Sequence, residues 1–262
     1  MPISFTAMTS GSGVATSLTT ASKTPTANTL QLLAVWNQDA TPDEDPVNPT
    51  VTGCDLTWVS VATQEMCPYA ALTTCARVTI FRALGAAPAT GALTISFGGV
   101  SSYGTYSWVE VPGTKITGAN GADAIVQSAG NFLAASGTSL TATLGAFANP
   151  LNGIFAMFGN TFPSGGSATV GSGFTLVHTL TRAGYGDGLS QTKVGQDTTV
   201  DSSIASSSYM GGLAVEIAVL PSDLPSNATV VTGLARTAGT TLIGALVAAC
   251  VGIGRALTGL AI

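Results

Sequence analysis

The strongest constraint on the fold of this chain is a succession of short apolar segments separated by breaks rich in Gly, Pro, Ser and Asn. Two of these breaks are GAAPATG (85–91) and FPSGGSATVGSG (162–173). About ten such segments follow one another, and no stretch of helical periodicity separates them. The pattern predicts an all-β domain over residues 1–220, an antiparallel β-sandwich of the jelly-roll type. It leaves open whether this domain is one jelly roll or two smaller units.

The segments themselves have the composition of strands. The run TLQLLAVWN (29–37) is almost entirely apolar, as expected of a buried central strand. LTWVSVAT (56–63) and ARVTIFRAL (76–84) show alternation, and they are rich in the Val, Ile and Thr that favour strands. Since no repeat of fixed length is visible, the sequence argues against a solenoid or a propeller.

Charged residues make up only 8% of the chain, against roughly 25% in an ordinary soluble protein. The net charge is −5, so the composition gives no reason to expect a nucleic-acid partner. A surface poor in charge suits a protein that packs side by side with others, because burying charges is costly. The alternative explanation is a GC-rich genome that favours Ala, Gly and Thr codons.

The N-terminal residues MPISFTAMTSGSG have neither the basic region nor the apolar region of a secretory signal. Ile3, Phe5 and Ala7 alternate with other residues, which predicts a strand near the start of the chain. We therefore expect synthesis in a cytoplasm and release by another route than general secretion. Lysis of a host cell that frees virions would be such a route.

The end of the chain has a different pattern. Residues 221–231, PSDLPSNATVV, have the prolines of a linker, and Ser226 or Asn227 would cap a helix that follows. Over residues 232–262 apolar side chains recur at spacings of three and four, which predicts a C-terminal apolar helix with a self-association seam. Small residues flank this seam and would let helices approach closely. The seam residues are Ile243, Leu246, Cys250, Ile253, Leu257 and Leu260.

Three arrangements of the predicted helix remain open. A helix buried among copies in an assembly explains both its apolar character and its seam. A membrane span needs about 20 apolar residues, whereas the uncharged stretch Thr237–Gly254 has 18, with Arg255 able to snorkel. The third arrangement is an amphipathic helix folded back on its own sandwich. Each glycine costs a helix about 1 kcal/mol relative to Ala, which disfavours an isolated helix in water.

Few residues carry recognisable catalytic chemistry. The sequence has one histidine, His178, and no G-x-S-x-G motif that would supply the nucleophile of a catalytic triad. It also has no second histidine that could complete a metal site. Glu110 and Glu216 lie within apolar strands. Such a carboxylate pair would serve a glycosidase, whereas the simpler interpretation is that each faces solvent or accepts a backbone hydrogen bond. We predict no catalytic residue, no cofactor and no enzymatic activity.

Two kinds of loop are candidates for ligand contacts. The acidic loop NQDATPDEDPVNP (37–49) offers oxygen ligands of the type Ca²⁺ prefers, from Asp39, Asp43, Glu44 and Asp45. Its spacing does not match an EF-hand, so we predict a solvated loop and no metal site. The segments GGVSSYGTYSW (98–108) and AGYGDGLSQ (183–191) would present aromatic rings to a sugar, although AGYGDGLSQ could equally be an ordinary long turn. Their candidate contact residues are Tyr103, Tyr106 and Tyr185.

The chain has four cysteines. Cys67 and Cys75 flank the segment CPYAALTTC, which a disulfide would close into a hairpin loop. Cys54 lies upstream, and Cys250 lies in the predicted seam. A bridge between Cys67 and Cys75 would leave two cysteines without a partner within reach, and the N-terminus does not have the pattern of a secretory signal. Both observations favour reduced thiols, so both states of Cys67 and Cys75 remain open.

Several segments resemble a known family. TVTGCDLTWVSVAT, RVTIFRALGAAPATGALTISFGG and YSWVEVPG are similar to segments of the β-sandwich domains of structural proteins from tailed bacteriophages. The resemblance covers roughly residues 3–220 and implies a virion-associated role, as minor tail protein, fibre, spike or capsid decoration. It implies that Trp58, Phe81 and Trp108 are core residues, and it marks no active site. The terminal helix is not part of the shared pattern.

These observations predict a non-enzymatic virion structural protein. Its β-sandwich would face outward, and its C-terminal helix would join symmetric copies and anchor them to other virion proteins. Three copies would suit a fibre or spike. The alternatives are a glycan-binding host-adsorption module, a membrane-anchored surface spike and a glycan hydrolase that uses Glu110.

Overall fold

A computed structural model describes residues 2–39, 46–67, 75–100, 102–161, 168–182, 186–220, 231–233 and 246–248. The chain divides into two compact units, Met1–Leu220 and Pro221–Ile262. Strands make up 60% of the structure and helix 3%. Every strand ladder is antiparallel. The prediction of an all-β, antiparallel chain is therefore confirmed.

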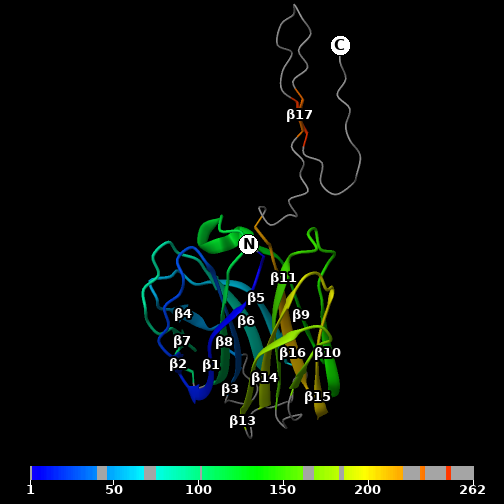
Figure 1. Cartoon of the computed structure of the whole chain (residues 1–262). Helices are drawn as coiled ribbons and strands as arrows, with labels where there is room; N and C mark the ends of the chain where they lie inside the picture. Colours follow the sequence, from blue (N-terminus) through cyan, green and yellow to red (C-terminus); the bar gives the residue numbers. More distant parts are fainter. Residues whose placement is uncertain are drawn as a thin grey trace, which may run out of the picture. The chain divides into compact units, whose positions relative to one another are not determined.

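Two five-stranded sheets form the centre of the first unit (Figure 1). The first large sheet has the order β1 (Thr6–Ala15), β8 (Ser102–Val111), β3 (Leu30–Asp39), β6 (Ala76–Ala83), β5 (Val59–Met66). The second large sheet has the order β13 (Thr175–Arg182), β14 (Gly186–Val194), β11 (Gly153–Asn160), β16 (Met210–Ile217), β9 (Ile125–Phe132). A short 3₁₀ helix, η1 (Ala119–Ala124), precedes β9.

Two three-stranded sheets cover the outer faces of the large ones. The first small sheet has the order β2 (Ser17–Thr19), β7 (Thr94–Ser96), β4 (Thr50–Thr52). The second small sheet has the order β10 (Gly137–Thr143), β15 (Thr199–Ser208), β12 (Ala168–Val170). The unit therefore has four β layers, with a separate apolar cluster in each of the three spaces between them.

Strand β3 explains why its sequence is apolar almost throughout. Leu32 and Trp36 point into the cluster between the two large sheets, whereas Leu33 and Val35 point into the cluster beneath the first small sheet. Since successive side chains of a strand face opposite ways, a strand between two layers needs apolar residues on both faces. Strand β11 is buried along its whole length in the same way.

The two halves of the unit have the same strand order. Adding eight to each strand number of the first large and small sheets gives the order of the second pair. Each half has the pairings of an eight-stranded jelly roll, except that its fifth strand joins the larger sheet. The first unit is thus two jelly-roll halves, packed through their large sheets.

The correspondence extends to the register. Gln31 of β3 lies opposite Glu110 of β8, and Ile154 of β11 lies opposite Glu216 of β16. The two glutamates occur in similar strands, WVEV and AVEI. The sequence shows no repeat of fixed length, because the loops of the two halves differ in length. The repetition therefore becomes visible only in the strand order and the register.

The second unit is described over two short strands only. β17 (Val231–Gly233) and β18 (Leu246–Ala248) pair in antiparallel fashion. Over Leu246–Ala248 the backbone is extended, which differs from the predicted helix of residues 232–262. The other seam residues, Ile243, Cys250, Ile253, Leu257 and Leu260, lie outside the described residues, so the helix and its seam stay predictions. Among the residues that are described, no helix is long and apolar enough to cross a membrane.

Candidate functional site

Glu216 of β16 is a carboxylate enclosed completely by the fold, at 0% exposure. Asn152 Nδ2 donates to its Oε1 at 2.5 Å, and Gln127 Nε2 donates to its Oε2 at 2.5 Å. Asn152 Oδ1 also accepts from the backbone N–H of Val219, and Gln127 is bonded to both backbone groups of Gly145. Through Gln127 and Asn152 the carboxylate therefore connects β9, the residue directly before β11, and Gly145 in the loop after β10.

Glu110 occupies the corresponding place in the first half. Its Oε2 accepts from the backbone N–H of Thr26 at 2.7 Å and from Gln31 Nε2 at 2.9 Å. Gln31 in turn accepts from the indole N–H of Trp108, at 2.9 Å. Glu110 is half-buried, so this network resembles that of Glu216 but is closer to solvent.

The two carboxylates do not form a pair. The neighbours of Glu216, Val215 and Ile217, point into the central cluster, so Glu216 itself points toward the second small sheet. Glu110 shares its face with Trp108, which lies beneath the first small sheet. Facing sheets lie about 10 Å apart, and these side chains point away from that space. The geometry of a glycosidase, with two carboxyl groups flanking one bond, is not present at Glu110 and Glu216.

A strip of polar side chains lies between the two large sheets. Ser190 of β14 donates to Ser107 of β8 across this space at 2.7 Å. His178 of β13 is paired with Ser190 in the ladder and shares its face. Burial lowers the pKa of His178, and its Nε2 is buried with no hydrogen-bond partner. Thr105 Oγ1 is likewise buried without a partner. Among the described hydrogen bonds and ion pairs, none joins a carboxylate to His178, so the strip lacks the acid that would orient a catalytic histidine.

The structure corrects the predicted glycan contacts of two tyrosines. Tyr103 and Tyr106 lie within β8, not on a loop, and are only 1% and 6% exposed. The ring of Tyr106 lies over Gly11 of β1, whose missing side chain leaves room for it. Neither ring can offer its face to a sugar from this position. Tyr185 lies outside the described residues.

The core residues implied by the family resemblance are found in one cluster. Phe81 and Trp108 are buried beneath the first small sheet, and Trp58 is partly buried against them. The rings of Trp58 and Trp108 meet edge to face, with centroids 6.0 Å apart. These residues pack together in the core of the first half.

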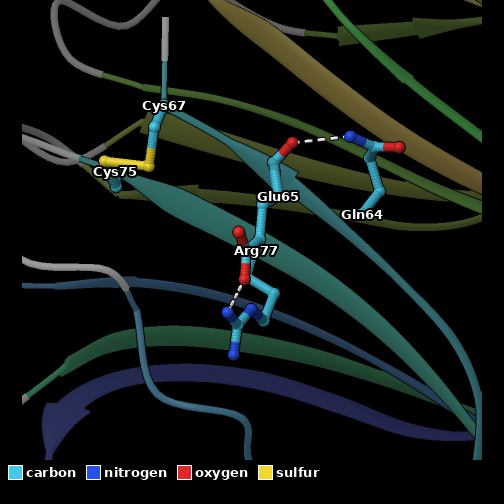
Figure 2. Close-up of a disulfide and its surroundings, with 5 residues drawn as sticks. All are labelled: Gln64, Glu65, Cys67, Cys75 and Arg77. Atoms are coloured by element: carbon cyan, nitrogen blue, oxygen red, sulfur yellow. Dashed lines mark hydrogen bonds and ion pairs between the residues drawn. A yellow bond between two sulfur atoms is a disulfide. The ribbon is translucent and has the colours of Figure 1, made fainter. Parts of the chain in front are cut away.

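Cys67 and Cys75 form a disulfide that closes the connection between β5 and β6 (Figure 2). Their Cα atoms lie 4.6 Å apart, just beyond the last ladder pair, Met66 and Ala76. Next to the bridge, Glu65 forms an ion pair with Arg77, a side chain that is only 6% exposed. Of the two thiol states left open by the sequence, the structure has the bridged one. Cys54 is a free, buried thiol.

The predicted acidic loop is described only at its ends. Asp39 is the last residue of β3, and Asp43, Glu44 and Asp45 lie outside the described residues. Across the described part of the chain, no three His, Cys, Asp or Glu side chains are grouped as metal ligands would be.

One hollow of about 400 Å³ lies on the surface of the second half. Phe147 and Asp197 line it, together with Ala146, Gln196 and Thr198. Both carboxylate oxygens of Asp197 are engaged, one by Lys193 Nζ at 2.6 Å and one by the backbone N–H of Thr199. The acid that lines the hollow is thus already engaged by its own segment.

The outer strands of the large sheets are edges at which a further strand could pair. β1 and β5 are the edges of the first large sheet, and β13 and β9 are the edges of the second. β1 lies against β13 and β5 lies against β9. Sequence reasoning did not single out these edges, because a strand's place in a sheet depends on its pairing partners.

Comparisons of the chain with protein-family models, with curated proteins and with solved structures found no match.

Proposed function

We propose that this protein is a non-enzymatic structural component of a bacteriophage virion. The observation that carries the proposal is the duplicated jelly-roll topology, with its three stacked apolar clusters. Jelly rolls are recurrent building blocks of viral particles, although the same fold also serves lectins and other proteins. The resemblance of three segments to phage β-sandwich proteins supports the same choice.

The composition and the chemistry of the domain agree with such a role. The buried carboxylate of Glu216 is bonded to Gln127 and Asn152 in a network that joins strands. A low content of charge suits a surface that contacts other proteins over large areas. We propose that the apolar C-terminal segment, residues 232–262, mediates the contact with other copies or with the particle.

The location in a virion is tested by mass spectrometry of particles. Phage particles from the organism that encodes the chain are purified through a density gradient, and the gradient fractions are digested. Peptides of this protein should follow the major capsid protein through the gradient at a constant ratio. Their absence from the particle fractions, with the protein found in the soluble lysate instead, would overturn the proposal.

The role of the C-terminal segment is tested separately by light scattering. The full chain should have the mass of a defined oligomer, and the chain ending at Leu220 should have a lower mass. If the full chain dissolves only with detergent or lipid while the shortened chain does not need it, the segment is a membrane anchor. The protein would then be a membrane-anchored spike.

A further inference from the structure

The four edge strands of the large sheets differ in how well they are protected from further pairing. β5 carries Glu65 and ends at the disulfide, and the last residue of β13 is Arg182. Charged side chains on an edge are a common means of preventing sheets from joining, because pairing would bury them.

β9 is protected in another way. The side chains of Gln127 and Asn131 bond to backbone groups of Gly145 and Thr141 in the adjoining layer. Gln64 of β5 closes over Gly130, leaving no room for even one added carbon there. Approach to this edge is therefore obstructed by side chains of the same molecule.

β1 has none of these protections. It spans ten residues, TAMTSGSGVA, with no proline and no charge, and its neighbour among the described strands is β8 on one side. The ladder with β8 is regular from Thr9 to Ala15, following one irregularity between Ala7 and Thr9. Its backbone N–H and C=O groups on the other side are a ready template for one more strand.

The charge of the surrounding segment indicates which strand would pair there. Lys23 is the first residue of the sequence with a charged side chain, so residues 1–22 offer no like charges to oppose each other. In an antiparallel pair of identical strands related by a two-fold axis, residues near the axis lie opposite or next to their own copies, so a charge there would oppose pairing. The centre of β1 alternates serine and glycine, Ser10 to Gly13, whose small side chains give no steric obstacle.

We propose that β1 pairs with β1 of a second copy of this chain in antiparallel fashion. The two first large sheets would become one ten-stranded sheet across a two-fold axis, an isologous contact made mainly by backbone hydrogen bonds. This inference deepens the proposed function by naming a partner surface. It depends on neither the C-terminal segment nor the virion location.

The test compares three forms of the full chain by sedimentation equilibrium over a range of concentrations. Ser12→Lys places a charge at an exposed position of β1, and Ser60→Lys places one at an exposed position of β5, the other edge of the same sheet. The unmodified chain and Ser60→Lys should share one mass, and Ser12→Lys should have half of it. Equal masses for all three forms would overturn the proposal.

Hydrogen exchange of the unmodified chain gives a second, independent readout. Unpaired edge amides exchange rapidly, so pairing should slow exchange in the peptide covering Thr6–Ala15 as concentration rises, by about tenfold or more. Peptides covering β5 should show no such dependence. If the exchange of the β1 peptide does not change with concentration, β1 does not pair with its copy. The density-gradient experiment tests the virion location, and the sedimentation and exchange experiments test the pairing of β1. Either proposal can therefore fail without the other.

Discussion

Glu216 shows at the scale of one residue how the fold uses a buried charge. Two amide donors replace the water that its carboxylate would bind in the unfolded chain. Since both donors are also anchored to backbone groups, the carboxylate acts as a connector between strands, not as a reactive group.

Glu216→Ala should therefore destabilise the domain by about 3 kcal/mol, because it leaves Gln127 and Asn152 without their acceptor. Glu110→Ala is the matched control from the other half and should cost about 1 kcal/mol, since Glu110 is nearer to solvent. Urea unfolding followed by tryptophan fluorescence measures both. Equal losses for the two variants would contradict this account of burial.

His178 makes a second prediction at this scale. Its pKa is lowered in the fold by burial, so below about pH 6.5 the unfolded chain binds a proton that the folded chain resists. The free energy of unfolding should therefore be fully retained above pH 6.5 and fall as the pH drops below it. Unfolding in urea at pH 7.5, 6.5 and 5.5 measures this slope.

The control is His178→Gln, which should flatten the slope over that range, because the sequence has no other histidine. The ring proton signals of this single histidine would also give its midpoint directly by NMR. A midpoint at or above 6.5 would contradict the structure.

At the scale of elements, the β5–β6 hairpin depends on its disulfide. A bridge that closes a loop of this length, between Cys67 and Cys75, stabilises a fold by roughly 2–3 kcal/mol in the chain-entropy model. The variant Cys67→Ser/Cys75→Ser should melt at a temperature lower by about 4–12 °C.

Scanning calorimetry with and without dithiothreitol provides the control for this prediction. Reductant should lower the melting temperature of the unmodified chain to that of the double variant and leave the variant unchanged. No effect of reductant on the unmodified chain would mean that the bridge adds nothing to stability.

At the scale of the whole first unit, the two jelly-roll halves share one core. Trp36 of the first half lies over Gly159 of the second, so closely that an added methyl group would meet its ring at 2.5 Å. The central cluster also joins Leu32 and Ile80 from the first half to Phe155 and Leu213 from the second. Neither half can lose its packing without exposing the other.

We therefore expect the halves to unfold together, in a single calorimetric transition for residues 1–220. Gly159→Ala should move that entire transition downward, at a cost of about 1–3 kcal/mol from overpacking. Gly91→Ala is the control, since an added carbon there meets its nearest neighbours at 3.9 Å and should have little effect. Two separated transitions, with only one of them shifted, would show that the halves are independent.

Within residues 1–220 the sequence by itself determined the class of fold and several of the longer strands. Alternation within strands and turn residues between them are local properties, so ARVTIFRAL and TLQLLAVWN could be assigned as strands without knowing their partners. The likeness of WVEV and AVEI was also visible in the sequence, but its meaning depended on the matching registers of the two halves.

Tertiary structure alone decided which faces of those strands meet water. Tyr106 is predicted at the surface, yet it is buried, because a small sheet built from three separate segments of the first half covers its side of β8. Glu110 and Glu216 point in opposite directions for the same reason: each large sheet has its own outer layer. Whether a strand lies at the edge or in the centre of a sheet, and whether its face is covered, depends on pairing between separate segments. A local sequence pattern does not encode that pairing.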